Sequence, residues 1–118
     1  MKRENSTKRI AKDLVLNNSN RLNEEDKKIY RSLIKGLGSM IIQNGLYGTL
    51  VFLRAKAKTH HLAVFDDIQH FLKEKNLFQG DDLLEFLENT ENLSVIQDRV
   101  LEFTNWYRRY ADIFIGGD

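Results

Sequence analysis

The chain of 118 residues contains no cysteine and no proline. Without cysteine it can form no disulfide, zinc ribbon or catalytic thiol. Proteins made of many short strands usually contain several turn prolines, so the absence of proline favours helices over a sandwich or barrel. No stretch approaches about 18 uninterrupted apolar residues, and the basic N-terminus lacks the apolar core of a signal peptide. The sequence therefore predicts a cytoplasmic protein that does not cross a membrane.

The composition is that of a folded protein. Apolar residues make up 42% of the chain and charged residues 30%, which argues against general disorder. A chain of this length forms one domain and buries about 65% of its unfolded surface in a single core. We expect a single domain over residues 1–118, with residues 1–7 as a flexible N-terminus.

Charge is unevenly distributed along the chain, although the net charge is only +1. Residues 1–58 contain thirteen Lys or Arg and five Asp or Glu, whereas residues 59–118 contain five and twelve. A basic half joined to an acidic half suggests one face that attracts polyanions and another that attracts basic protein surfaces.

Apolar residues recur every three or four positions along most of the chain, which predicts amphipathic helices. The fold class is therefore all-α, a compact single-domain bundle of five to six helices. The expected helices are Thr7–Asn17, Glu24–Leu37, Ser39–Lys58, His60–Lys75, a short acidic helix to about Glu88 that Asp81 caps, and a last helix from Ser94 to Phe114.

Local signals define the expected helix boundaries. The run 17–20, rich in asparagine, is typical of a connector, and Asn23 is a strong N-cap for the second helix. Gly36 and Gly38 are expected to end or kink that helix, and a bend is expected near Gly45 in the third. Ser94 and Gln97 have the spacing of a capping box for the last helix.

Basic side chains cluster on the polar faces of the first three expected helices. If these faces adjoin, they form one cationic surface suited to a phosphate backbone, because Lys and Arg gain affinity by releasing condensed counterions. For any one stripe, a solvated helix face is the ordinary alternative. The ten candidate residues are Lys8, Arg9, Lys12, Lys27, Lys28, Arg31, Lys35, Arg54, Lys56 and Lys58.

The segment from Gln43 to Lys56 reads QNGLYGTLVFLRAK. It resembles the small subunit of type III-B CRISPR effector complexes, the Cmr or RAMP-module complexes, which shows a similar Asn-Gly-Leu, a small-apolar helix ending in Phe-Leu, and a nearby Lys. The final helix, with Asn105–Ala111 reading NWYRRYA, looks like the closing helix of that family, and Tyr30 fits a family tyrosine. The family often has a proline before its central helix, and this chain has none.

The resemblance implies a non-catalytic scaffold in antiviral defence, with no cofactor. Its implied partners are guide RNA and target RNA, other subunits of the effector complex, and copies of the chain itself in a filament-like stack. RNA then becomes the expected polyanion for the ten basic residues, and guide pairing supplies the sequence specificity.

Two catalytic or metal-binding alternatives rest on spacing alone. Arg54 and His60 have the spacing of helical HEPN ribonucleases, in which an imidazole moves a proton and a guanidinium stabilises phosphorane charge. That spacing is common by chance, so a stand-alone ribonuclease or a nucleic-acid-binding adaptor stays the alternative.

Asp66, His70 and Glu74 form a line on one helix face, but three exposed ligands from one helix seldom enclose an ion. We expect no catalytic residue and no metal site.

Overall fold

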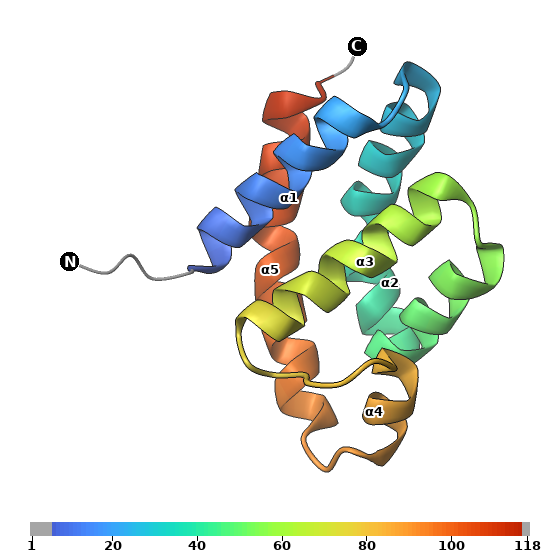
Figure 1. Cartoon of the computed structure of the whole chain (residues 1–118), viewed down its shortest axis with the longest axis vertical. Helices are drawn as coiled ribbons and strands as arrows, with labels where there is room; N and C mark the ends of the chain where they lie inside the picture. The colour runs from blue at the N-terminus through green and yellow to red at the C-terminus, as the bar shows by residue number, and fades with distance from the viewer. Residues whose placement is uncertain (1–5, 117–118) are drawn as a thin grey trace.

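The computed structural model describes residues 6–116, which form five α-helices without a strand in that range (Figure 1). This confirms the expected all-α bundle. Of the N-terminal segment expected to be flexible, residues 1–5 lie outside the described range, whereas Ser6 caps the first helix and Thr7 begins it. The helices are α1 (Thr7–Arg21), α2 (Glu24–Lys56), α3 (Thr59–Glu74), α4 (Leu83–Asn89) and α5 (Leu93–Phe114).

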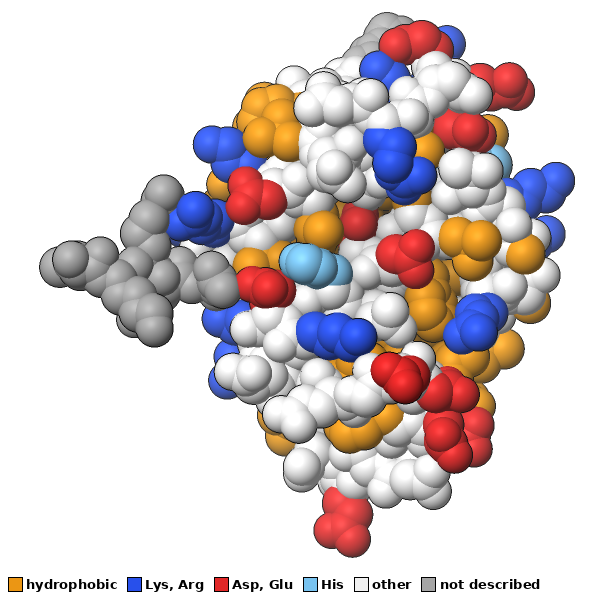
Figure 2. All heavy atoms as spheres, viewed as in Figure 1, with side chains coloured by type: hydrophobic (Ala, Val, Ile, Leu, Met, Phe, Trp, Pro, Cys, Tyr) orange, Lys and Arg blue, Asp and Glu red, His pale blue; other side chains and the backbone are white. Residues whose placement is uncertain are grey.

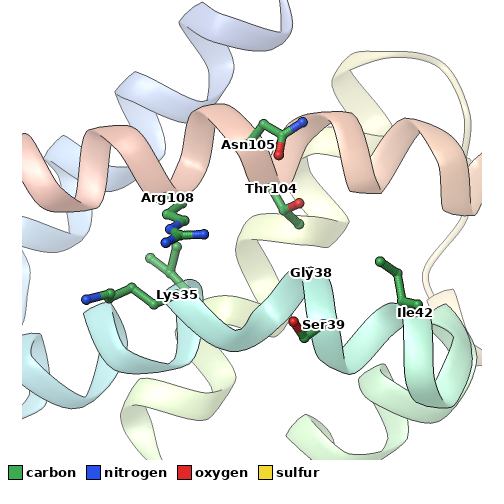
Figure 3. A pocket seen from close by; sticks show the side chains of 8 residues that line it. Lys35, Gly38, Ser39, Ile42, Thr104, Asn105 and Arg108 are labelled. Carbon is green, nitrogen blue, oxygen red and sulfur yellow. The ribbon is translucent and has the colours of Figure 1, made fainter.

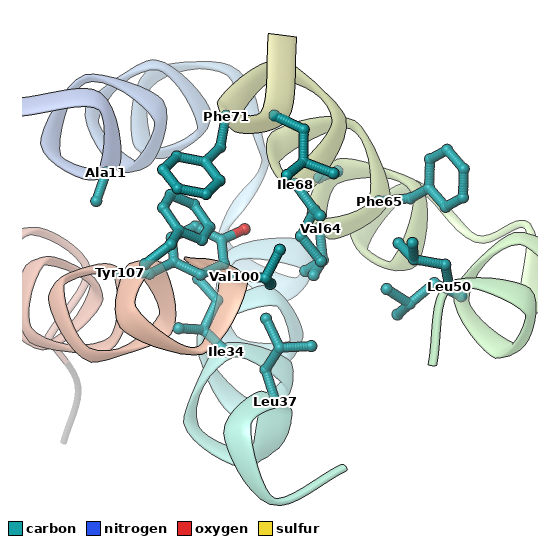
Figure 4. Close-up of a cluster of buried hydrophobic side chains, with 14 of the residues drawn as sticks. Ala11, Ile34, Leu37, Leu50, Val64, Phe65, Ile68, Phe71, Val100 and Tyr107 are labelled. Atoms are coloured by element: carbon teal, nitrogen blue, oxygen red, sulfur yellow. The ribbon is translucent and has the colours of Figure 1, made fainter. Parts of the chain in front are cut away.

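Helix α2 is the centre of the bundle and packs against α3 and α5, while α1 lies across α5 and α3 (Figure 1). The core contains a column of rings, in which Phe103 stacks between Phe71 and Tyr107 with centroid distances of 4.6 Å on each side (Figure 4). By length and composition α2 could cross a membrane. Here its apolar face is instead covered by neighbouring helices, as in the core helix of a globular protein.

Helix α1 is longer than the sequence predicts. The asparagine-rich run 17–20 is not a connector, because α1 continues to Arg21. Asn18 is buried there, and its amide reaches side chains of two other helices. Asparagine disfavours helix interiors because its side chain competes for backbone hydrogen bonds, and tertiary partners remove that competition here.

Helix α2 does not end or kink at Gly36 or Gly38, which both lie in continuous helix. The break is at Gly45, as the sequence predicts, where φ is 79° and ψ is 159°. The freed amide of Leu46 donates to Gln97 Oε1 at 2.8 Å. The expected capping box is therefore wrong, because the Gln97 side chain accepts from the backbone of α2. Helix α5 begins at Leu93, one residue before the expected Ser94, and Asn92 is its N-cap.

Gly45 gives a first testable prediction. Its dihedral angles belong to a region that only glycine adopts readily, so Gly45→Ala is expected to lower the free energy of unfolding by about 2 kcal/mol. Gly48→Ala is the control, because the added Cβ would lie an ordinary 3.7 Å from the Asn44 side chain. Alanine also favours helix over glycine by up to about 1 kcal/mol. Urea unfolding measures both. Equal effects of the two substitutions would contradict a role for the kink.

Candidate nucleic-acid interface

The basic residues of α1 lie at one edge of the molecule. Lys8 Nζ sits 5.4 Å from the centre of the Trp106 ring on α5. The Arg9 guanidinium is 3.8 Å from the Asp13 carboxylate, one turn along the same helix. Lys12 is exposed. Each of these side chains thus contacts a neighbouring residue of the same molecule or extends into solvent, which is the ordinary arrangement of a solvated helix face.

The first half of α2 carries four of the predicted residues. Lys27 pairs with Glu24 at 2.8 Å on the same helix, and Arg31 Nη2 pairs with Asp112 Oδ1 of α5 at 2.9 Å. Lys28 and Lys35 are exposed, and within the described chain no carboxylate lies at ion-pair distance from either. Two of the four cations are therefore partly neutralised inside the same molecule.

The third group lies where α2 ends and α3 begins. Arg54 stacks on the Phe65 ring with its guanidinium carbon 5.4 Å from the ring centre, and Lys56 Nζ lies 5.8 Å from the centre of Phe52. Lys58 immediately precedes α3 and is exposed. Phe52 itself is 37% exposed on the second half of α2.

The first and third groups lie on different sides of the bundle, and the ten residues as one RNA-binding set stay a prediction. Helix α1 packs on α5 and α3, and its basic residues lie across the molecule from the end of α2 (Figure 1). Figure 2 shows Lys and Arg interspersed with Asp and Glu over the face that it presents. Carboxylates from both halves of the chain take part, since Asp13 and Glu24 pair with Arg9 and Lys27, and Asp112 of the acidic half pairs with Arg31.

Sequence reasoning missed Arg108, which faces α2 from α5. Figure 3 shows its side chain extending from α5 towards α2, at the same end of a groove as Lys35, with Ile42 at the other end. The groove has a volume of about 220 Å³. No carboxylate is among the side chains that line it, which are Ile34, Lys35, Gly38, Ser39, Ile42, Thr104, Asn105 and Arg108. We call this the α2–α5 groove.

Sequence reasoning also missed a buried carboxylate that joins four helices. Asp67 of α3 is 4% exposed, and its Oδ2 accepts from the hydroxyls of Tyr30 at 2.5 Å and Tyr107 at 2.6 Å. The Asn18 amide donates to both Asp67 oxygens at 3.0 Å, and the Arg21 guanidinium donates to Asn18 Oδ1.

The electrostatics of this network follow from its burial. Burial raises the pKa of Asp67 to about 7, against the lowering effect of its hydrogen bonds from Tyr107, Tyr30 and Asn18. Burial and the nearby Asp67 carboxylate also raise the pKa values of both tyrosines. The network is enclosed by the helices, so its role is structural.

Arg54 and His60, the pair with ribonuclease spacing, are held by different neighbours. His60 is 8% exposed, and its Nδ1 lies 3.1 Å from Asp26 Oδ1, whereas Arg54 stacks on Phe65. An imidazole this buried does not reach a phosphodiester, so the geometry disfavours the ribonuclease alternative.

On the polar face of α3, His70 Nε2 is 3.9 Å from Glu74 Oε2, an ordinary pair one turn apart. Over residues 6–116 no three His, Asp or Glu side chains gather in a way that could hold a metal ion.

The short helix α4 carries an exposed acidic face. Asp82, rather than the expected Asp81, caps it by accepting from the Glu85 amide at 3.1 Å. Glu88 accepts a hydrogen bond from the Tyr47 hydroxyl at 2.9 Å, which ties α4 to α2. The Glu88 carboxylate raises the pKa of Tyr47. The remaining carboxylates of this face extend into solvent and are available to a basic partner.

Two comparisons with known proteins match this chain over nearly all of its length. Residues 4–114 match the family model described as "CRISPR-associated protein (Cas_Cmr5)", a range that includes all the helices of the described chain. The chain is also similar to a Thermotoga maritima protein described as "CRISPR system Cmr subunit Cmr5". The two are 33% identical over 121 aligned residues, which cover all of this chain and 91% of the relative. No solved structure matches the chain at a significant level.

Proposed function

The chain belongs to the Cmr5 family of CRISPR-associated proteins, and from that premise we propose that it is a structural, non-catalytic subunit of a CRISPR Cmr complex. The match over the full chain is the observation that carries this proposal. The subunit acts in the cytoplasm, as part of antiviral defence, through its shape and its contacts within the complex. The buried His60 and the stacked Arg54 support a role without catalysis.

The subunit contacts the phosphate backbone of guide or target RNA through α2 and the facing side of α5. Lys28 and Lys35 support this proposal, because they are exposed cations without an ion-pair partner in the described chain. Arg108 adds a third cation from α5. A backbone contact fits a subunit of an RNA-guided complex, in which base pairing reads the sequence.

Copies of the chain stack head to tail, with the acidic face of α4 against a basic surface of the next copy. Asp81, Asp82 and Glu85 are exposed at one end of the bundle (Figure 1), and opposite charges orient such contacts. Because the two surfaces differ, the contact is heterologous and repeats along an open array. Arrays also raise RNA affinity by avidity, so one isolated copy binds RNA weakly.

Charge reversal of the two unpaired α2 lysines tests the RNA contact. Lys28→Glu with Lys35→Glu is expected to weaken binding of single-stranded RNA at least tenfold, since two attractive phosphate contacts become repulsive. The logarithmic salt slope of binding should fall by about 0.7 for each phosphate that the variant no longer neutralises. Fluorescence anisotropy over a series of salt concentrations measures both.

The matched control reverses Lys73 and Arg99, which changes the net charge equally but lies on other surfaces. We expect it to weaken binding no more than about twofold, through the long-range field alone. Equal effects of the two double variants, or binding that does not change with salt, would contradict the proposed contact.

A further inference from the structure

Helices α2 and α5 run antiparallel in a regular register. Arg31 meets Asp112, and Leu46 meets Gln97 toward the other end of the contact. Between these pairs, an added Cβ at Gly38 would lie 3.5 Å from Thr104 Oγ1. The same register places Lys35 opposite Arg108, and both line the α2–α5 groove. One turn of the contact is thus closed by an ion pair, and the next turn presents two cations.

Lys35 and Arg108 are both exposed, and no carboxylate is among the side chains that line the groove they share. The neighbouring turn shows that the same two helices accommodate a carboxylate at this seam, since Asp112 pairs with Arg31 there. Two exposed cations that line one space without a carboxylate favour the binding of a negative group from outside the chain.

The groove has a second feature, an apolar end. Ile42 is 71% exposed at the end away from Lys35 and Arg108 (Figure 3). Ser39 lines the middle from α2 and offers a hydroxyl, and Asn105 lines it from α5 with its amide directed away from α2 (Figure 3). Gly38 has no side chain, which leaves the floor of the groove open. The complementary ligand has a negative group at one end, polar groups in the middle and an apolar surface at the other end.

We propose that the α2–α5 groove binds one nucleotide of an RNA strand. Its phosphate lies between Lys35 and Arg108, its ribose hydroxyls face Ser39, and its base lies against Ile42. This assignment rests on the RNA contact proposed above and locates it at one groove. It adds Arg108, Ser39 and Ile42 to the residues that the sequence indicated.

The phosphate group favours a nucleotide over an acidic peptide as the occupant. The Arg108 guanidinium has a planar fork of donors that pairs with two phosphate oxygens, and Lys35 adds a compact point charge. A nucleotide within a strand carries its single negative charge on the phosphate, which fits a groove whose other lining groups are neutral. An acidic helix would bring several carboxylates, and Ser39, Asn105 and Ile42 offer no cation for the others.

The two glycines of α2 provide a steric test that leaves charge unchanged. Gly38→Ala adds a methyl group to the groove floor at an ordinary 3.5 Å from Thr104 Oγ1, whereas at Gly36 an added Cβ meets nothing within 4 Å. Both substitutions replace a helical glycine with alanine, a better helix former, so both variants fold. We expect Gly38→Ala to weaken binding of a ten-nucleotide oligouridine about fivefold, and Gly36→Ala to leave it unchanged.

Arg108→Gln tests the charge, with Arg99→Gln on the same helix as its control. We expect the first to weaken oligouridine binding about tenfold, in line with loss of a charge-assisted hydrogen bond, and the second less than twofold. Backbone amide NMR of the full chain locates the site, because resonances of Gly38, Ser39 and Asn105 should shift on titration with the oligonucleotide.

Each outcome decides between the two proposals. RNA binding that Gly38→Ala and Gly36→Ala affect equally, or amide shifts elsewhere on the surface, would overturn the groove and leave the wider RNA contact standing. Displacement of RNA by an acidic peptide with shifts at the same amides would assign the groove to a protein partner instead. Shifts with uridine monophosphate as strong as with the oligonucleotide would assign it to a free nucleotide, which also overturns the strand assignment.

Discussion

Replacing Asp67 with leucine is expected to lower the free energy of unfolding by about 3 kcal/mol, although leucine is more easily buried than a carboxylate. The reason is that three donors lose their shared acceptor. The hydroxyls of Tyr30 and Tyr107 and the amide of Asn18 all donate to Asp67, and all three side chains are buried. When the acceptor of a buried network is removed, its donors stay buried without a hydrogen-bond partner. That penalty exceeds the free energy gained by burying leucine in place of a carboxylate.

The neighbouring Asp66 provides the control, because it is exposed on the same helix. Asp66→Leu is expected to change the free energy of unfolding by less than about 0.5 kcal/mol. Urea unfolding followed by circular dichroism measures both variants. A small effect of Asp67→Leu, or one equal to that of Asp66→Leu, would show that the four-helix network contributes little to stability.

Stability should fall as the pH rises through neutrality, and Asp67 should account for much of that change. Its pKa is about 7 in the folded protein, against an ordinary value of 3.8. A group whose pKa is raised on folding contributes stability at low pH that is lost as the pH rises through the folded value. Between pH 5 and pH 8 this loss is about 3 kcal/mol, since each pKa unit is worth about 1.4 kcal/mol.

The difference in unfolding free energy between the wild-type chain and Asp67→Asn isolates this contribution, because asparagine does not titrate. The groups that face Asp67 are Tyr30 of α2, Tyr107 of α5 and Asn18 of α1, with Asp66 beside it on α3. All four are present in both chains, so the titration of the two tyrosines and of Asp66 largely cancels in the difference. The difference should therefore shrink steadily between pH 5 and pH 8. A constant difference would mean that Asp67 stays ionised throughout.

Much of the fold follows from local patterns in the sequence. The three- and four-residue spacing of apolar side chains predicts the helical regions, and Gly45 predicts the bend, because these signals act within one turn of chain. The two helices expected at 24–37 and 39–58 are one helix, because Gly36 and Gly38 do not interrupt it. The predicted helix boundaries are wrong where contacts with residues distant in the sequence stabilise the helix. The asparagine-rich end of α1 is helical because Asn18 reaches Tyr30 and Asp67, and no local pattern connects those three positions.

The candidate site was harder to predict for a related reason. Counting charge by halves of the chain groups Arg108 with the acidic residues, whereas the fold places it beside Lys35 of the basic half. The same counting treats Arg31 as free, although Asp112 pairs with it from 81 positions away. Only the antiparallel register of α2 and α5 decides which cations face one another. The family, by contrast, was accessible from short segments such as 43–56, because their order along the chain is retained.

Cross-linking of RNA to this subunit within the assembled complex tests the central proposal most directly. The tagged chain is purified from its native host after incorporation of 4-thiouridine and ultraviolet irradiation, and the cross-linked peptides are identified by mass spectrometry. The account predicts that guide RNA and other effector subunits copurify, and that cross-linked peptides come from the first half of α2 and from α5 around Arg108. A chain that copurifies with those subunits but carries no RNA cross-link on these helices would contradict it.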